Sequence, residues 1–258
     1  MRFIVAVKQV PNTGDMTVDA EGNLIREGVE SILNPYCEAA LMKAMALRGP
    51  DDTVEAVTMG PGQSEAALRR CLELGADRAY LISDRAFAGA DTWATARTLV
   101  AFFTRYGCDA DLLLFGRQSI DGDTGQVPTE VARLLDVQQF CYTDSLTIEG
   151  DCFVAVQDYG DTRRACRVPK GSVISFSSLD LRGALPTARG YMDSLGKEII
   201  TLDRVALGLG LYSVGGKGSP TRIVSTSGST SVRRNRKVDI SNPATASDLL
   251  IREIGGIE

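Results

Sequence analysis

Short apolar runs alternate with segments of helical periodicity over the first 135 residues of the chain. The runs have the length and composition of β-strands and cover residues 3–8, 53–59, 79–82 and 111–115. The last run is apolar almost throughout, which is typical of strands that helices cover on both faces of a parallel sheet. The segments between and after the runs predict helices that begin at Asn34–Pro35 and that cover 64–74, 91–106 and about 127–135. This order predicts an α/β fold with a doubly wound parallel sheet and right-handed crossovers.

The rest of the sequence is expected to add a β-rich segment and an arm to that sheet. A small hairpin is predicted around residues 17–25, and four runs after residue 136 predict an appended meander, at 144–148, 153–157, 163–168 and 172–176. From about Gly190 the chain becomes rich in glycine and serine, and a short amphipathic helix over 246–254 closes it. We therefore expect an α/β domain of residues 1–190 and a C-terminal arm of residues 191–258.

The arm contains too few apolar residues to form a core of its own, so it is either disordered or ordered by another polypeptide. Leu207, Leu209, Leu211 and Tyr212 favour the second alternative, because such residues are expected to be buried.

Composition excludes several classes of function. The 258 residues include no histidine, which rules out Ser-His-Asp and Cys-His nucleophiles and His-ligated metals. The six cysteines form no C-x-x-C pair and are expected to be small buried hydrophobes, so no metal site and no catalytic residue is predicted. If the protein takes part in catalysis, a bound cofactor must supply the chemistry.

Charge and hydropathy also limit the partners. A net charge of −5 and a pI of about 5.0 argue against nucleic-acid binding. No run of 18 apolar residues occurs and the N-terminus does not resemble a signal peptide, so we expect a cytoplasmic protein without direct membrane insertion.

The loop Gly116–Val127 is the most informative local feature. It follows a predicted buried strand and precedes a helix, where free backbone N–H groups and the helix dipole can hold a phosphate. Gly116, Gly122 and Gly125 would let the backbone approach a ligand, and Thr124 offers a hydroxyl. Asp121 and Asp123 are expected to accept hydrogen bonds from ribose hydroxyls, loop amides or solvent. The alternative is a glycine-bearing turn that binds nothing.

Ligands of doubly wound sheets bind beyond the carboxyl ends of the strands, so the loop is expected to act together with other strand ends and helix starts. Neither a G-x-x-x-x-G-K-[ST] motif nor a G-x-G-x-x-G motif after the first strand is present, so a nucleotide must bind in another way. The predicted cofactor-binding residues are Ala6, Asn34, Pro35, Tyr36, Cys37, Met59, Gly116, Arg117, Gln118, Ser119, Ile120, Asp121, Gly122, Asp123, Thr124, Gly125, Gln126 and Val127.

Six segments together carry a family resemblance. They read VAVKQVP from Val5, NPYCEAA from Asn34, MGP from Met59 with LRR from Leu68, LGADRA from Leu74, and GRQSIDGDTGQV from Gly116. In order and spacing they resemble the beta subunit of electron-transfer flavoproteins, closely over residues 1–135 and more weakly beyond. The resemblance implies a Rossmann-like domain, an adenine nucleotide at the predicted surface, and a C-terminal arm that embraces a flavin-bearing alpha subunit in a heterodimer.

The resemblance leaves two cofactors open. Housekeeping members of the family hold AMP as a structural ligand, whereas electron-bifurcating members hold a second FAD that takes a hydride from NADH. The segment DGDTGQV from Asp121 is closer to the FAD-holding group, and Gly122 and Gly125 leave room for a pyrophosphate, so we favour FAD over AMP. The function implied is electron transfer between NADH, the alpha-subunit flavin and a flavin dehydrogenase such as an acyl-CoA dehydrogenase.

Two stretches depart from the family pattern. Gln157 stands where a basic residue is usual, and VPKG from Val168 replaces the usual LPAV. In the stretch that recognises the dehydrogenase, Ala188 falls where an anchoring leucine is expected, which leaves the partner dehydrogenase undefined. An alternative of another class, a solitary nucleotide-hydrolysing or nucleotide-sensing protein, is opposed by the core-poor arm.

Overall fold

The computed structural model describes residues 1–12, 17–18, 24–25, 30–181, 183–221, 247–248 and 251. The chain divides into a larger unit of residues 1–17 and 25–225 and a smaller one of residues 18–24 and 226–258. In the smaller unit Ser247, Asp248 and Ile251 are helical, and the rest of the helix expected over 246–254 lies outside the described residues. The main sheet and the helices that cover it belong to the larger unit.

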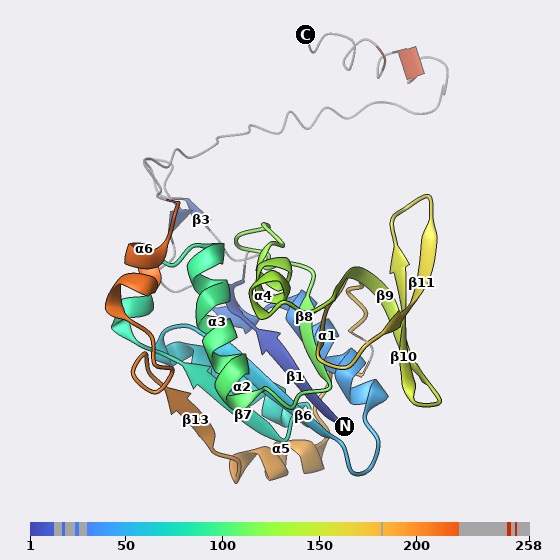
Figure 1. Ribbon diagram of the computed structural model, residues 1–258, viewed down its shortest axis with the longest axis horizontal. Coiled ribbons are helices and arrows are strands. Elements are labelled where there is room, and N and C mark those ends of the chain that lie inside the picture. The colour runs from blue at the N-terminus through green and yellow to red at the C-terminus, as the bar shows by residue number, and fades with distance from the viewer. Residues whose placement is uncertain are drawn as a thin grey trace. The chain divides into compact units, whose positions relative to one another are not determined.

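A nine-stranded sheet forms the centre of the larger unit, in the order β11-β10-β9-β12-β8-β1-β6-β7-β13 (Figure 1). Its strands are β1 (Arg2–Val7), β6 (Thr53–Met59), β7 (Arg78–Ile82), β8 (Leu112–Gly116), β9 (Gln139–Glu149), β10 (Cys152–Asp158), β11 (Arg163–Val168), β12 (Ser172–Phe176) and β13 (Ile199–Leu202). Two small sheets pair β2 (Gln9–Pro11) with β5 (Ser31–Leu33) and β3 (Thr17–Val18) with β4 (Leu24–Ile25). The pairing of β3 with β4 confirms the predicted hairpin.

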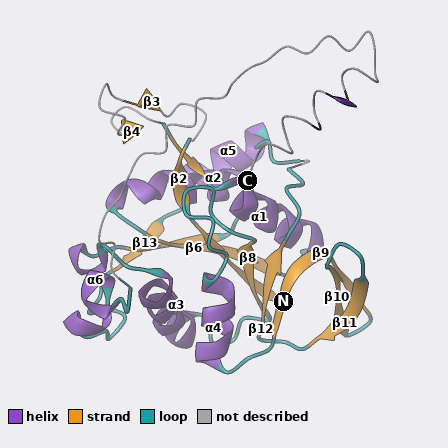
Figure 2. Cartoon of the chain, turned by 90° about the horizontal axis from the view of Figure 1, so that it is seen from above, coloured by secondary structure: helices purple, strands orange, loops and turns teal. Residues whose placement is uncertain are grey.

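Helices cover both faces of the sheet, as Figure 2 shows for α1, α2 and α5 on one side and α3, α4 and α6 on the other. The helices are α1 (Pro35–Leu47), α2 (Glu65–Glu73), α3 (Thr92–Tyr106), α4 (Val127–Leu135), α5 (Ala188–Leu195) and α6 (Gly215–Gly218). Short 3-10 turns cover Gly62–Ser64, Arg85–Phe87 and Leu211–Ser213.

The central strands are apolar because both of their faces are buried. In β1, Phe3 and Val5 pack in the core cluster that contains Leu41 of α1, whereas Ile4 packs in the cluster that contains Phe102 of α3, and none of these side chains is exposed. Every pairing among β12, β8, β1, β6, β7 and β13 is parallel. The predicted α/β fold with a parallel sheet is therefore confirmed.

The prediction that 172–176 belongs to an appended meander was wrong. β12 lies between β8 and β9 and runs parallel to both. Its side chains are buried, including Val173 and Ile174 at zero exposure, so it is a core strand. Only β9, β10 and β11 form an antiparallel meander. β13, which pairs in parallel with β7, was not predicted, and the larger unit continues past residue 190 to Ser225.

The prediction that all six cysteines are buried was also wrong. Cys37 and Cys71 are buried, three others are half-buried, and Cys108 is exposed in the turn between α3 and β8. None of the six is in a disulfide.

Candidate functional site

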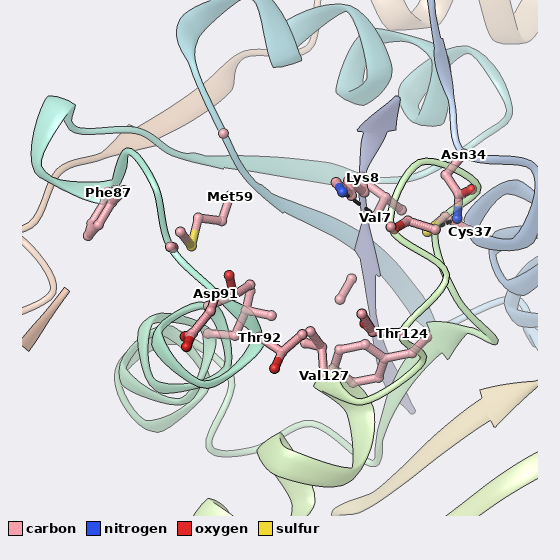
Figure 3. A pocket seen from close by; sticks show the side chains of 18 of the residues that line it. Val7, Lys8, Asn34, Cys37, Met59, Phe87, Asp91, Thr92, Thr124 and Val127 are labelled. Carbon is pink, nitrogen blue, oxygen red and sulfur yellow. Dashed lines mark hydrogen bonds between the residues drawn. The ribbon is translucent and has the colours of Figure 1, made fainter. Parts of the chain in front are cut away.

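A cavity of about 1060 Å³ lies beyond the carboxyl ends of β1, β6, β7 and β8. Figure 3 shows Lys8, Asn34 and Cys37 gathered at one side of it and Met59 and Phe87 at another. This is where doubly wound sheets bind ligands, because the loops after successive parallel strands meet at one edge.

The sequence-predicted residues divide into two groups. Thirteen line the cavity, and these are Ala6, Asn34, Cys37, Met59, Gly116, Arg117, Gln118, Ser119, Gly122, Thr124, Gly125, Gln126 and Val127. Five others do not line it, and these are Pro35, Tyr36, Ile120, Asp121 and Asp123. Tyr36, Ile120 and Asp123 contact members of the first group, through the backbone or through hydrogen bonds. Asp121 pairs with Lys8, which also lines the cavity.

Asn34 fastens the start of α1 to the glycine loop. Its Nδ2 atom donates to the carbonyl of Gln118 at 2.8 Å and to the Cys37 thiol at 3.1 Å, and its Oδ1 accepts from the N–H of Ile120 at 3.2 Å. The residue is fully buried. It occupies the N-cap position as predicted, but its side chain makes no capping hydrogen bond. The amide therefore holds the binding loop in place.

Cys37 is a structural group in this arrangement. Burial raises the pKa of its thiol, although hydrogen bonds from Asn34 and the backbone act in the opposite direction. A neutral thiol is a weak nucleophile, so the side chain serves to fill space under the loop.

The two loop aspartates accept hydrogen bonds from neighbouring side chains. Both oxygens of Asp121 accept from the Lys8 ammonium, at 2.7 and 2.8 Å, and Asp123 accepts from Nε2 of Gln118 at 2.9 Å. Burial alone would raise the pKa of Asp121, but the Lys8 and Ser119 hydrogen bonds lower it below its usual value. The ion pair therefore fixes the loop against the end of β1.

Two glycines of the loop have roles in the fold itself. A Cβ atom on Gly116 would lie 2.5 Å from the backbone carbon of Tyr36 and 2.7 Å from the nitrogen of Cys37. Gly116 thus permits β8 to touch the start of α1. Gly125 has φ +63°, a conformation that favours glycine.

The start of α4 offers hydrogen-bond donors to the cavity. Among the described residues, the backbone N–H groups of Thr124, Gly125, Gln126 and Val127 have no hydrogen-bond partner. Three of the four residues precede the helix, whose dipole places partial positive charge at this end. Such donors can hold a phosphate group, and phosphate binding at this loop stays a prediction.

Sequence reasoning missed the loop after β7, which forms another wall of the cavity. Its lining residues include Asp84, Phe87, Asp91 and Thr92. A hydrogen bond from the N–H of Ala86 is the largest of the effects that lower the pKa of Asp84. The signal was available, because strand 79–82 was predicted and every strand end on this edge is a candidate.

Asp91 caps α3 at the cavity wall. Its side chain accepts from the N–H of Ala94 at 2.9 Å and from the N–H and hydroxyl of Thr221, at 3.0 and 2.7 Å. Burial alone would raise the pKa of Asp91, but these hydrogen bonds lower it. The segment that precedes residue 222 is therefore attached to the first turn of α3.

Thr92 links the starts of α3 and α4. Its hydroxyl lies 3.2 Å from Oε1 of Gln126 and 3.0 Å from Oε1 of Glu130. The other oxygen of Glu130 is buried without a partner. Burial, and to a smaller extent the charge of Asp91, raises the pKa of Glu130. The two helix starts are thus held together by a partly desolvated carboxyl group.

Comparisons with known proteins agree with this architecture. A family model described as the electron transfer flavoprotein domain matches residues 22–170. The electron transfer flavoprotein subunit beta of Thermoanaerobacterium thermosaccharolyticum is 39% identical over 231 residues, which cover 88% of each chain. The chain belongs to the electron transfer flavoprotein beta-subunit family. The predicted resemblance is therefore confirmed.

Other relatives of this family member carry more specific names. The caffeyl-CoA reductase-Etf complex subunit CarD of Acetobacterium woodii is 38% identical, with 86% of each chain covered. Protein FixA of Azotobacter vinelandii is 40% identical, with 86% of this chain and 82% of the relative covered. In the described part of this electron transfer flavoprotein subunit, no helix is both long and apolar enough to cross a membrane.

Proposed function

We propose that the chain is the small subunit of a heterodimeric electron-transfer flavoprotein, and that its cavity holds FAD. In this proposal the subunit carries electrons in the cytoplasm between NADH, the flavin of the alpha subunit and a dehydrogenase, by flavin-based electron bifurcation. The observation that carries the choice of FAD is the extent of the cavity. It continues from the glycine loop, past Met59, to the loop after β7.

The lining fits both halves of a dinucleotide. The N–H groups from Thr124 to Val127 and the Arg117 side chain would hold phosphate. Ala6, Met59, Phe87, Leu99 and Phe115 supply apolar surface for the rings. At about 1060 Å³ the cavity is at the upper end of the usual range for small-molecule sites, which favours a dinucleotide over a mononucleotide.

Bound FAD would supply hydride acceptance and single-electron transfer, chemistry that a cofactor and not the protein's own side chains provides. The protein contributes position and electrostatics. Asn34 and the Lys8–Asp121 ion pair keep the loop in shape, and Asp91 and Thr92 do the same for the opposite wall.

We propose an alpha subunit and a CoA-thioester dehydrogenase, such as an acyl-CoA dehydrogenase, as partners. The name of the A. woodii relative places it in a caffeyl-CoA reductase complex, and a 35% identical relative from Anaerotignum propionicum is named as an electron transfer subunit of acryloyl-CoA reductase. Val205 and Tyr212, in the proposed arm, are 68% and 80% exposed and offer apolar surface to the alpha subunit.

Cofactor analysis tests the proposal. The chain is co-expressed with its alpha subunit, and the purified heterodimer is denatured to release nucleotides for chromatography. Two FAD molecules per heterodimer are expected. One FAD together with one AMP would refute the FAD assignment and leave a structural subunit that holds AMP. A stable monomeric chain that hydrolyses nucleotides alone would refute the heterodimer.

A further inference from the structure

Tyr142 has a backbone conformation that bulky residues rarely adopt. It lies within β9 with φ +57°, in the left-handed region, and its side chain is 48% exposed. Such outliers persist only where the surroundings impose them, and they are concentrated at functional sites.

A β-bulge imposes this conformation. In the pairing of β9 with β12, Ile174 faces Phe140 but Phe176 faces Thr143, so β9 has one extra residue between the paired positions. Bulges of this kind redirect a side chain next to a binding site.

Buried polar side chains hold the bulge on both sides. Nε2 of Gln157 donates to the carbonyl of Cys141 at 2.7 Å, and the hydroxyl of Thr143 donates to the carbonyl of Phe140 at 2.9 Å. Gln157 is 5% exposed and Thr143 is not exposed. Gln157, one of the positions at which the sequence departs from the family pattern, thus supports the backbone beside Tyr142.

The redirected ring of Tyr142 lies under a cavity-lining arginine. The guanidinium carbon of Arg117 is 5.5 Å from the centroid of the Tyr142 ring, within the range of cation–π attraction. Unlike Lys8, which pairs with Asp121, Arg117 has no carboxylate within 4.0 Å in the described part of the chain. Its charge is therefore available to an anion.

Arg117 is also close to the donors at the start of α4. A Cβ atom on Gly125 would lie 3.3 Å from the Arg117 carbonyl oxygen, so the two ends of the loop are in contact. Arg117 and the residues from Thr124 to Val127, whose N–H groups are free, all line the cavity.

We propose that Arg117 binds a phosphate group of the adenine nucleotide and that Tyr142 is a positioning residue, which holds the guanidinium at that place. The inference rests on the proposed function, since it assumes a nucleotide in this cavity. Tyr142 itself does not contact the nucleotide.

The test compares AMP with adenosine, which lacks the phosphate. Affinities are measured by isothermal titration calorimetry on the nucleotide-free full-length chain, and the nucleotide content of the co-purified heterodimer is measured as a second readout. The variants are Arg117→Gln, Arg117→Lys, Tyr142→Asn, Tyr142→Phe and the double variant Arg117→Gln/Tyr142→Asn. Asparagine tolerates the left-handed conformation, so Tyr142→Asn removes the ring without adding backbone strain. Tyr159→Asn, at a tyrosine of similar exposure in the β10–β11 turn, is the matched control.

We expect Arg117→Gln to weaken AMP binding about tenfold or more and to leave adenosine binding unchanged. Tyr142→Asn should weaken AMP binding about threefold, while Tyr142→Phe retains the parental affinity. The double variant should bind AMP as weakly as Arg117→Gln alone, because without the guanidinium the Tyr142 ring has nothing to position. The AMP affinity of Arg117→Lys should lie between those of the parent and Arg117→Gln, because a lysine keeps the charge but lacks the planar guanidinium that can donate two parallel hydrogen bonds.

An unchanged ratio of AMP to adenosine affinity in Arg117→Gln would overturn the inference and leave the proposed function intact. An equal loss for both ligands in Tyr142→Asn would indicate general damage to the cavity and would also overturn it. Independent effects of the two substitutions in the double variant would remove the positioning role. If the parent binds neither ligand and the heterodimer releases no adenine nucleotide, the proposed function fails first.

Discussion

Gly116 offers the most direct test of how β8 and α1 share the wall of the cavity. In Gly116→Ala, the new methyl group would lie 2.5 to 2.7 Å from three backbone atoms of Tyr36 and Cys37. Ordinary carbon contacts begin near 3.5 Å, so the helix start or the strand must move by nearly 1 Å. β8 is paired on both sides, with β1 and β12, and is therefore held in place. We expect the start of α1, with Asn34, to shift instead.

Overpacking of this kind costs about 1–3 kcal/mol, and contact with backbone atoms on both sides favours the upper part of that range. For a unit of this size, a loss of 2–3 kcal/mol corresponds to a fall in Tm of roughly 4–12 °C. The matched control is Gly62→Ala, at another glycine that lines the cavity, where an added Cβ would meet nothing within 4 Å.

The assay is urea unfolding of the full chain, followed by fluorescence of its only tryptophan, Trp93, in the first turn of α3. Gly62→Ala should stay within about 0.5 kcal/mol of the parent. Similar free energies of unfolding for the two variants would refute the argument, because only one of them places a methyl group against the backbone.

Three further substitutions test single side chains. Asn34→Ala should lower the unfolding free energy by about 2–3 kcal/mol in urea titration, since it leaves buried loop groups unpaired, and a loss below about 0.5 kcal/mol would contradict the role of the amide. The pKa of Glu130 is raised in the folded protein, so stability falls as the pH rises from 4.5, the ordinary pKa of this group, through the folded pKa. Glu130→Gln should flatten that part of a plot of Tm against pH. An unchanged slope would count against burial of Glu130 as the cause of the pH dependence. For Asp111, burial alone would raise the pKa, but hydrogen bonds from Lys170 and the N–H of Arg2 lower it. The stability that this carboxylate contributes is therefore present above pH 3.8 and is lost as pH falls through the folded pKa. Asp111→Asn should lower the unfolding free energy by roughly 1 kcal/mol at neutral pH and reduce the loss of stability in acid, as measured by urea titration at several pH values.

The local sequence pattern was sufficient to predict the strands that helices cover on both faces. β1, β6 and β8 are apolar runs because helices pack on each side, and this is visible without knowing the partners of each strand. It was not sufficient for β12, because five buried residues have the same pattern in a meander as in the centre of a parallel sheet. Only the pairing, which is a long-range property, separates the two.

The site was predictable to a similar degree. The glycine loop and the start of α1 were found because their residue types indicate backbone donors at a helix start. The role of Asn34 was not, because its side chain bonds to the carbonyl of Gln118, 84 positions away, instead of capping the backbone of its own helix. Tyr142 gave no signal at all, since a tyrosine within a strand does not indicate a positive φ.

The attachment of Thr221 to Asp91 joins the last residues of the described stretch 183–221 to the start of α3. Because Asp91 is the N-cap of α3 and lines the cavity, Thr221 is held close to Thr92 at the cavity wall. The carboxylate of Asp91 thus connects this stretch of the chain to the wall of the cavity.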